Sequence, residues 1–254
     1  MNKALDAMQA LFGDKKRPFL IAHRGNRALC PENTLTSFRQ AVQDGADILE
    51  TDVHLSADGE FICIHDATVN RTTDSSGAIA DMTVKEIQAL RALDPAGVPT
   101  EERIPTLAEV ASILPPQVAL ALELKTDRFL EADVCRRFGI VLQQNRIYAR
   151  SFTLSFSLPR LQSLQRAVED MPIGWITMSR LLPDQAVELI GPFWPIVYLN
   201  PRYVAQAHRR GMFVCPLDPK PEKRLRHYLK LGCDALISDN PAVTRAALDH
   251  LMSA

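Results

Sequence analysis

Short apolar runs alternate with longer segments of helical periodicity along almost the whole chain, and this alternation most constrains the fold. Eight apolar runs are predicted to be strands: 19–22, 47–53, 118–124, 147–151, 172–176, 196–199, 212–215 and 235–238. Each is followed by a predicted helix, beginning near residues 34, 106, 130, 156, 183, 201, 220 and 240. Strands that alternate with helices form parallel sheets. Eight such units in 254 residues fit a closed (β/α)8 TIM barrel better than an open sheet.

One connection is much longer than the others. Residues 57–60 are predicted to form a hairpin turn that returns through 61–64, and a long polar segment follows at 67–104. Long segments of this kind in compact domains are typical of lids or small subdomains. We therefore expect one domain over residues 1–254, with an insertion at 67–104 after the second strand and a short helix within it.

Composition indicates a small-molecule partner. The net charge is -1 and 23% of residues are charged, which gives no basic surface for nucleic acid. No run approaches the ~20 apolar residues of a membrane span, so no stable membrane insertion is expected.

The first 17 residues lack the apolar core and cleavage site of a signal peptide, which predicts a cytoplasmic location. The five cysteines are scattered and predict free thiols. A monomer and a homo-oligomer both stay open.

Carboxylates gather where two predicted strands end. Glu50 and Asp52 are two residues apart at the end of the second strand, so both face one side of it. Glu123 and Lys125 repeat this arrangement on the third strand. The carboxyl ends of barrel strands surround the active site, so we expect these groups to converge at the mouth. The alternative interpretation is a set of salt bridges to Lys125 and Arg24.

Three close carboxylates suggest a metal ion. They repel one another by several kcal/mol in a low-dielectric site unless a proton or a cation intervenes. All-oxygen ligands, without cysteine or a paired histidine motif, favour Mg²⁺ or Ca²⁺ over Zn²⁺. We therefore predict a divalent cation on Glu50, Asp52 and Glu123, with room for water and a phosphate oxygen.

Two histidines and two positively charged side chains are predicted at the same mouth. His23 ends the first strand and His65 ends the returning hairpin strand, which suits a general acid and a general base. The alternative for each is a core histidine bonded to a backbone carbonyl. Arg24 and Lys125 are expected to bind phosphate oxygens. Asp66 points the other way along an extended strand, so it is expected in a turn or behind a site residue.

Several other residues could line the site or serve only the fold. Asn33 or Thr34 is expected to cap the first helix, and Asn33 could also reach the site. His54 shares the strand face of the carboxylates but lies past the predicted strand end. Barrel packing or an interface is the expected role of three residues that could otherwise line a pocket: Trp175, Arg180 and Trp194.

Seven motifs occur in order over residues 23–125: His23-Arg24-Gly25, Pro31-Glu32-Asn33-Thr34, Glu50-x-Asp52, Asp58-Gly59, His65-Asp66, Ile104-Pro105-Thr106-Leu107 and Glu123-Leu124-Lys125. In this order they resemble the glycerophosphodiester phosphodiesterase family. The resemblance implies a (β/α)8 barrel with an insertion after its second strand, a divalent metal on the three carboxylates and acid-base catalysis by His23 and His65. It also implies hydrolysis of glycerophosphocholine or glycerophosphoethanolamine to sn-glycerol 3-phosphate and an alcohol, through a cyclic phosphate or by direct attack of water.

The resemblance weakens late in the chain. Cys215-Pro216-Leu217-Asp218 stands where the family often carries an aromatic residue followed by Thr-Val-Asn, and Thr153 stands where an acidic residue is common. These departures concern the alcohol that is recognised more than the reaction, because the metal and acid-base residues are intact. Asp218 adds a negative charge that could lie near the pocket.

Two alternatives stay open. One is a lysophospholipase D-type enzyme acting on lysophospholipids, which would need an apolar rim. The insertion supplies five apolar residues for such a rim at 79, 82, 84, 87 and 90, but they are expected to form a small core of their own. The other alternative is a non-catalytic phosphodiester-binding protein, which has little physical reason to keep two histidines beside the phosphate.

Overall fold

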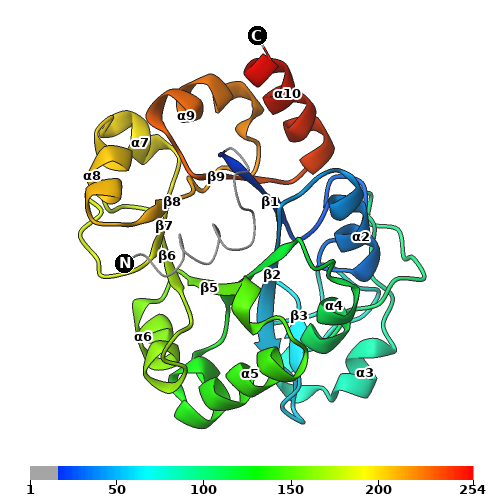
Figure 1. Ribbon diagram of the computed structural model, residues 1–254. Coiled ribbons are helices and arrows are strands. Elements are labelled where there is room, and N and C mark those ends of the chain that lie inside the picture. Colours follow the sequence, from blue (N-terminus) through cyan, green and yellow to red (C-terminus); the bar gives the residue numbers. More distant parts are fainter. Residues whose placement is uncertain (1–16, 254) are drawn as a thin grey trace.

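Nine strands form one sheet that curls into a barrel (Figure 1). The structure is a computed structural model that describes residues 17–253. The strands are β1 (Phe19–His23), β2 (Ile48–Leu55), β3 (Phe61–Cys63), β4 (Ala119–Leu124), β5 (Ser151–Ser155), β6 (Ile173–Thr177), β7 (Leu189–Pro192), β8 (Phe213–Val214) and β9 (Ala235–Ser238). Eight of them are parallel and follow the order β8-β7-β6-β5-β4-β2-β1-β9, whereas β3 pairs with β2 in the antiparallel sense.

The barrel is nearly closed between β8 and β9. The backbone N–H of Asp234, which directly precedes β9, donates to the carbonyl oxygen of Val214 in β8 at 2.9 Å. The carbonyl oxygen of Asp234 in turn accepts from Phe19 at the start of β1, also at 2.9 Å. The predicted (β/α)8 TIM barrel is therefore confirmed.

Helices surround the strands on the outside of the barrel (Figure 1). They are α2 (Leu35–Gln43), α3 (Val84–Gln88), α4 (Leu107–Ile113), α5 (Ala132–Gln144), α6 (Leu158–Ala167), α7 (Pro195–Leu199), α8 (Tyr203–Arg209), α9 (Leu225–Leu231) and α10 (Pro241–Ser253). Thr34, Thr83 and Thr106 start α2, α3 and α4 with side chains that accept the backbone N–H three residues on. Such threonine caps satisfy N–H groups that the first turn leaves free.

Apolar side chains pack on both sides of the strands. The lumen is filled by a cluster that includes Phe19, Phe152 and Phe213, and larger clusters lie between the strands and the helices. Strands that are buried on both faces are typical of a parallel barrel. The core therefore fixes the strand ends, where the polar residues of the site lie.

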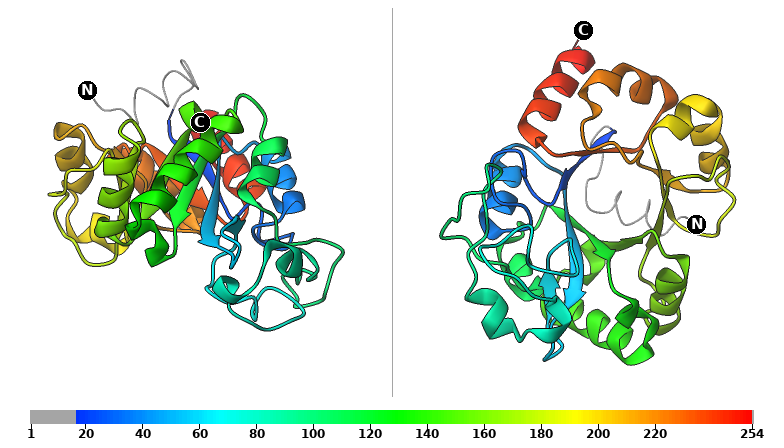
Figure 2. Two further views of the ribbon diagram at one scale, coloured as in Figure 1. Left: turned by 90° about the horizontal axis from the view of Figure 1, so that it is seen from below. Right: turned by 180° about the vertical axis from the view of Figure 1, so that it is seen from behind.

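The insertion projects from the end of the barrel where β2 finishes (Figure 2, left, cyan to teal). It holds α3 and the short 3₁₀ turn η1 (Ile79–Asp81). Its apolar residues pack together in a cluster with Ile62, Ile64 and Val69. The expectation that these residues form a core of their own is therefore confirmed, and they do not supply an apolar rim.

Two predicted strands are wrong. The segment 147–151 contains the 3₁₀ turn η3 (Tyr148–Arg150), and β5 begins only at Ser151, because the Arg150 guanidinium holds this turn by donating to the carbonyl oxygens of Pro115 and Val118. The run at 196–199 lies in α7, where Pro195 takes the first helical position. The strand in this part of the barrel is β7, seven residues earlier.

The helix predicted near residue 183 is also wrong. Residues 178–188 connect β6 to β7 without a helix. Val187 in this segment is buried in the outer core, so packing holds the connection in an irregular conformation. The remaining predicted helices are present, with starts shifted by one to five residues.

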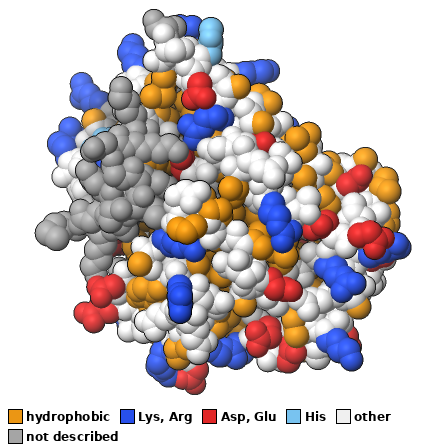
Figure 3. Space-filling view, turned by 45° about the vertical axis from the view of Figure 1, so that its right-hand side comes forward, with side chains coloured by type: hydrophobic (Ala, Val, Ile, Leu, Met, Phe, Trp, Pro, Cys, Tyr) orange, Lys and Arg blue, Asp and Glu red, His pale blue; other side chains and the backbone are white. Residues whose placement is uncertain are grey.

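The surface agrees with the expected small-molecule partner. Basic and acidic side chains are interspersed on the face in Figure 3 and form no single-sign patch there. None of the helices in residues 17–253 is long and apolar enough to cross a bilayer.

All five cysteines are free, as expected, although Cys30 and Cys215 are only partly buried. Residues 1–16, where a signal peptide would lie, are outside the described residues. The cytoplasmic location stays a prediction.

Candidate active site

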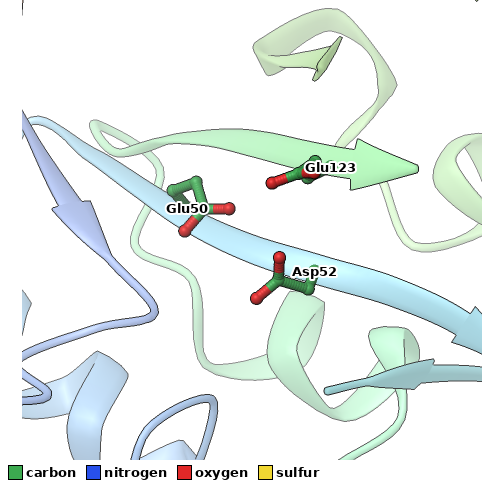
Figure 4. Close-up of side chains that lie close together, drawn as sticks. All are labelled: Glu50, Asp52 and Glu123. Atoms are coloured by element: carbon green, nitrogen blue, oxygen red, sulfur yellow. The ribbon is translucent and has the colours of Figure 1, made fainter. Parts of the chain in front are cut away.

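Three carboxylates converge inside the mouth of the barrel (Figure 4). Glu50 and Asp52 project from β2 and Glu123 projects from β4, and one oxygen of each lies within 4.8 Å of the others. Asp52 and Glu123 are direct neighbours across the two strands. The two-residue spacing predicted that the β2 carboxylates share one face. The structure therefore brings all three predicted carboxylates together.

Burial makes this group of carboxylates electrostatically unfavourable. Loss of hydration raises the pKa of Glu50 well above its usual value, and the nearby Asp52 raises it further. The same two causes raise the pKa of Glu123 to about 7. Burial also opposes ionisation of Asp52, but Arg24 and Lys125 hold its pKa below the usual value. A bound proton or cation would relieve the repulsion among the three groups.

Asp52 is held by neighbours on its Oδ2 side. This oxygen accepts a hydrogen bond from Asn33 Nδ2 at 3.0 Å and lies 3.1 Å from Arg24 Nε. Its Oδ1 atom is buried and accepts no hydrogen bond from the described residues, although Lys125 Nζ lies 3.6 Å away. A buried carboxylate oxygen without a donor suits a cation ligand. Thr34 caps the helix, so Asn33 is free to reach the site.

A left-handed turn after β1 places Arg24 over the carboxylates. Arg24 and Gly25 have φ values of 58° and 77°. The backbone N–H of Arg24 donates to the carbonyl oxygen and to Oε2 of Glu50, at 3.1 and 3.0 Å. A Cβ atom at Gly25 would lie 2.4 Å from Ser37 Oγ, so only glycine permits this approach to α2. The His-Arg-Gly triplet thereby directs the guanidinium into the site.

His23 is paired with an aspartate from the far end of the chain. Its Nδ1 atom lies 2.6 Å from Oδ1 of Asp239, which directly follows β9. Burial lowers the pKa of His23, and the bond to Asp239 opposes this change. Because a carboxylate only accepts hydrogen bonds, Nδ1 carries the hydrogen. The Nε2 atom of the neutral ring is then a proton acceptor.

His65 has a similar partner from its own turn. Its Nδ1 atom lies 2.6 Å from Oδ1 of Asp66, and its Nε2 atom accepts a hydrogen bond from Lys125 Nζ at 3.0 Å. The same ammonium donates to Glu123 Oε1 at 3.0 Å. Burial is the largest cause of the lowered pKa of His65. Burial opposes ionisation of Asp66, but bonds from Arg71 and His65 lower its pKa to about 2.

Glu32 lies among three arginines. Its carboxylate oxygens lie 3.0 Å from a guanidinium nitrogen of Arg24, 2.9 Å from one of Arg27 and 2.8 Å from one of Arg71. Burial opposes ionisation, but the bond to Arg71 and the nearby guanidinium charges lower the pKa of Glu32 to about 2. Charge-assisted bonds of this kind fix arginine side chains in one orientation.

The same arginines connect Glu32 to both histidine partners. Arg71 Nε donates to Asp66 Oδ2 at 2.6 Å, and Arg27 NH1 lies 3.9 Å from Asp239 Oδ1. Neither Glu32 nor Asp239 is among the site residues predicted from the sequence. A catalytic or metal-binding histidine usually has a carboxylate or carbonyl on its second ring nitrogen. This rule predicts a partner for His23, but it does not say which carboxylate the fold brings there.

Four of the other candidates are not members of the carboxylate group. His54 Nε2 lies 3.1 Å from the carbonyl oxygen of His65, at hydrogen-bond distance, and His54 is not in the carboxylate group. Trp175 and Trp194 pack against apolar clusters outside the barrel, as expected. Arg180 is exposed on the connection after β6. Of these four residues, His54 borders the predicted site through its contact with His65.

The fold and the site together define a class of protein. The carboxyl ends of the strands in a (β/α)8 barrel are where barrel enzymes carry their active sites. This barrel places two histidines and a group of three buried carboxylates at that end. The protein is therefore a barrel enzyme, and comparisons with known proteins identify its family.

The model of the glycerophosphoryl diester phosphodiesterase family matches residues 23–243. A glycerophosphodiester phosphodiesterase from Caldanaerobacter subterraneus subsp. tengcongensis is 30% identical over 235 residues, which cover 89% of this chain and 95% of the relative. The chain belongs to the glycerophosphoryl diester phosphodiesterase family.

Solved structures share the fold. A phosphodiesterase from Oleispira antarctica, in complex with the product sn-glycerol-3-phosphate, has a TM-score of 0.79 and 26% identity, over 91% of this chain and 97% of that one. A glycerophosphodiester phosphodiesterase from Agrobacterium tumefaciens also has a TM-score of 0.79, with 23% identity over 91% of this chain and 100% of that one. The second likeness concerns the fold alone.

Proposed function

We propose that this chain hydrolyses glycerophosphodiesters, such as glycerophosphocholine or glycerophosphoethanolamine, to sn-glycerol 3-phosphate and a free alcohol. The observation that carries the proposal is a group of three buried carboxylates flanked by two histidines, each with an aspartate on Nδ1. The product bound in the Oleispira antarctica relative supports it. A pure binding protein would have no use for two such histidines.

We further propose that Glu50, Asp52 and Glu123 hold a divalent cation, Mg²⁺ or Ca²⁺. The residues fit such an ion, because they offer only oxygen ligands and Asp52 Oδ1 has no hydrogen-bond donor. Burial and the nearby Asp52 raise the pKa values of both glutamates, so a bound cation would stabilise their ionised forms. When bound, the ion would supply Lewis-acid polarisation of a phosphoryl oxygen.

Arg24 and Lys125 are the proposed phosphate-binding residues. Both side chains already touch Asp52 or Glu123 and therefore border the place where a phosphodiester would sit. Their positive charges would bind the non-bridging oxygens and stabilise charge that develops on them in the transition state. The turn at Arg24 and the bond from Lys125 to His65 hold both groups in position before substrate binds.

His23 and His65 are the proposed acid-base pair. One accepts a proton from the nucleophile, and the other donates a proton to the alcohol oxygen as its bond to phosphorus breaks. Each transfer contributes roughly 10² to 10⁴-fold to the rate. The lowered pKa values favour neutral rings in the free enzyme, so the acid must gain its proton in the complex with the substrate phosphate.

Two nucleophiles fit this arrangement. A neighbouring glycerol hydroxyl would attack phosphorus and give a cyclic phosphate that water opens, whereas water would give sn-glycerol 3-phosphate directly. A ³¹P NMR time course separates the two, because only the first route produces a transient cyclic phosphate signal.

The test of the function is release of sn-glycerol 3-phosphate from glycerophosphocholine and glycerophosphoethanolamine by the purified protein. The reaction is run with Mg²⁺, with Ca²⁺ and with excess chelator. We expect release that stops with chelator and returns with one of the two ions. Absence of release with both ions from both substrates would contradict the proposal. A lysophospholipid is the second candidate substrate, favoured by the apolar side of the lumen near Leu154 and Ile176.

A further inference from the structure

One side chain of the insertion reaches back to the mouth of the barrel. Arg71 lies in a turn of the insertion, and its guanidinium contacts two carboxylates. Its Nε atom donates to Asp66 Oδ2 at 2.6 Å, and its two terminal nitrogens donate to the two oxygens of Glu32 at 3.1 and 2.8 Å. Asp66 is the partner of His65, whereas Glu32 lies in the loop between β1 and α2. Arg71 therefore joins the insertion to the barrel and to the partner of a proposed acid-base residue.

The two histidine-aspartate pairs are held in different ways. His23 ends β1 and Asp239 directly follows β9, so the pairing of these two strands fixes the first pair. The strand β3 already ends at Cys63, and the side chains of His65 and Asp66 are 31% and 30% exposed. Holding a partly exposed side chain in one rotamer costs conformational entropy. The second pair therefore depends on a further contact to keep one orientation.

Arg71 supplies this contact. Asp66 Oδ1 lies 2.6 Å from His65 Nδ1, and Asp66 Oδ2 accepts the bond from Arg71, so both oxygens of the carboxylate are bonded and its plane is fixed. On the other side of the ring, His65 Nε2 accepts a bond from Lys125 at 3.0 Å. A single exposed ion pair contributes little, but an arginine that forks onto two carboxylates has a defined geometry. The imidazole of His65 is thus held at both nitrogens.

The insertion fixes the backbone on both sides of Arg71. The carbonyl oxygen of Thr72 accepts from the backbone N–H of Leu93 at 2.9 Å, and the backbone N–H of Thr73 donates to the carbonyl oxygen of Val69 at 3.1 Å. The side chain of Val69 is fully buried in the core of the insertion. The position of Arg71 is therefore set by the folding of the insertion.

The barrel fixes the other end of the contact. The Glu32 side chain is only 9% exposed, and its oxygens also contact Arg24 at 3.0 Å and Arg27 at 2.9 Å. All three of these residues lie between β1 and α2. The guanidinium of Arg71 is therefore held from the insertion through its backbone and from the barrel through Glu32.

We propose that Arg71 is a positioning residue for His65, and that the insertion is in this way part of the active site. The inference rests on the proposed function, because it concerns how one member of the acid-base pair is oriented. Arg71 fixes the carboxylate of Asp66, and Asp66 fixes the ring. The guanidinium nitrogens of Arg71 bond to Asp66 and Glu32, so its role differs from the phosphate binding proposed for Arg24 and Lys125.

The first test compares kcat and KM on glycerophosphocholine for the wild type, Arg71→Ala and Arg91→Ala. Arg91 is a matched control, because it lies in the same insertion and its Nε donates to a carboxylate there, Asp74, at 2.9 Å. We expect kcat of Arg71→Ala to fall roughly 10- to 100-fold with little change in KM, as for other partners one contact removed from a functional histidine. Arg91→Ala should keep the wild-type rate.

A double variant shows whether Arg71 acts through Asp66. Asp66→Ala alone should lower kcat, and adding Arg71→Ala should cause almost no further loss, since the contact is already absent. Guanidinium chloride at a low, non-denaturing concentration should restore part of kcat in Arg71→Ala, whereas sodium chloride should not. The ion can reach the vacated place, because Arg71 lines a polar cavity of about 300 Å³.

Arg71→Lys keeps the positive charge and guards against a loss of folding. Its kcat should still fall severalfold, because one ammonium cannot replace the planar fork between two carboxylates. Wild-type kcat in both Arg71 variants, a change in KM alone, or losses that multiply in the double variant would overturn the inference and leave the proposed function standing. Absence of hydrolysis by the wild-type enzyme would overturn both.

Discussion

The Oδ1 atom of Asp239 lies 2.6 Å from the Nδ1 atom of His23, although 216 residues separate them in the sequence. The barrel makes this contact possible, because β9 pairs with β1 in parallel and both strands end at the mouth. A carboxylate in this position selects the tautomer in which Nε2 faces the site. The first and last strands of the barrel thus build the histidine-aspartate pair that we propose for proton transfer.

Replacing this carboxylate tests the pair directly. Asp239→Asn keeps the shape but removes the charge and allows the wrong tautomer of His23. We expect kcat to fall roughly 10² to 10⁴-fold with little change in KM, by the logic of other histidine-aspartate pairs. Steady-state kinetics on glycerophosphocholine measure this, with circular dichroism as the control for folding. An unchanged kcat would show that Asp239 has no part in proton transfer.

Glu32 should contribute strongly to stability in a pH-dependent way. Its pKa is about 2 in the folded protein against 4.5 for the free group, so its contribution is complete above pH 4.5 and is lost as the pH falls toward 2. The shift corresponds to roughly 3 kcal/mol. Glu32→Gln should therefore lower the free energy of unfolding by about this amount at pH 7 and by clearly less at pH 3.

Urea unfolding of wild type and Glu32→Gln at both pH values measures the difference. Glu101→Gln serves as the control, because Glu101 is an exposed carboxylate. A difference between wild type and Glu32→Gln that stays constant from pH 7 to pH 3 would contradict the electrostatic explanation.

Cation binding should depend on the protonation of Glu123. Its pKa is about 7 without a bound cation, so a cation must displace a proton from a large fraction of molecules near neutral pH. Affinity for Mg²⁺ or Ca²⁺ should be weaker at pH 6 than at pH 8, and proton release should accompany binding. Calorimetry in buffers of different ionisation enthalpy measures both, and Glu123→Gln should bind at least about tenfold more weakly. Equal affinity at both pH values would contradict the assignment.

The turn after β1 should tolerate no side chain at Gly25. Alanine there combines a φ of 77° with a Cβ atom 2.4 Å from Ser37 Oγ. Gly97 has a similar φ of 83° but nothing within 4 Å of an added Cβ. Both alanine variants carry backbone strain of about 1–3 kcal/mol, so Gly25→Ala should be clearly less stable than Gly97→Ala in urea unfolding. Equal losses would show that the contact with α2 is not tightly packed.

The barrel could be predicted because its strands and helices alternate over the whole sequence. The details failed where local composition was misleading. The apolar run at 196–199 looks like a strand, but Pro195 starts a helix there, and the true strand Leu189–Pro192 is short and contains glycine and proline. In a barrel whose strands are buried on both faces, periodicity cannot separate a strand from a buried helix segment.

The site was predictable to the extent that strand ends determine it. The two-residue spacing of Glu50 and Asp52 placed them together, and parallel pairing brought in Glu123. The contacts of Glu32 and Asp239 could not be derived, because they depend on how the loops after β1 and β9 fold over the mouth. Neighbours of this kind are set by tertiary structure and leave no periodic signal in the sequence.

The central claim is that His23 takes part in the hydrolysis of a phosphodiester at the carboxylate site. The most direct measurement is the rate of sn-glycerol 3-phosphate release from glycerophosphocholine by His23→Ala, beside His250→Ala, which changes an exposed histidine on α10. The account predicts a loss of roughly 10² to 10⁴-fold for His23→Ala and a wild-type rate for His250→Ala. A wild-type rate for His23→Ala would contradict the account.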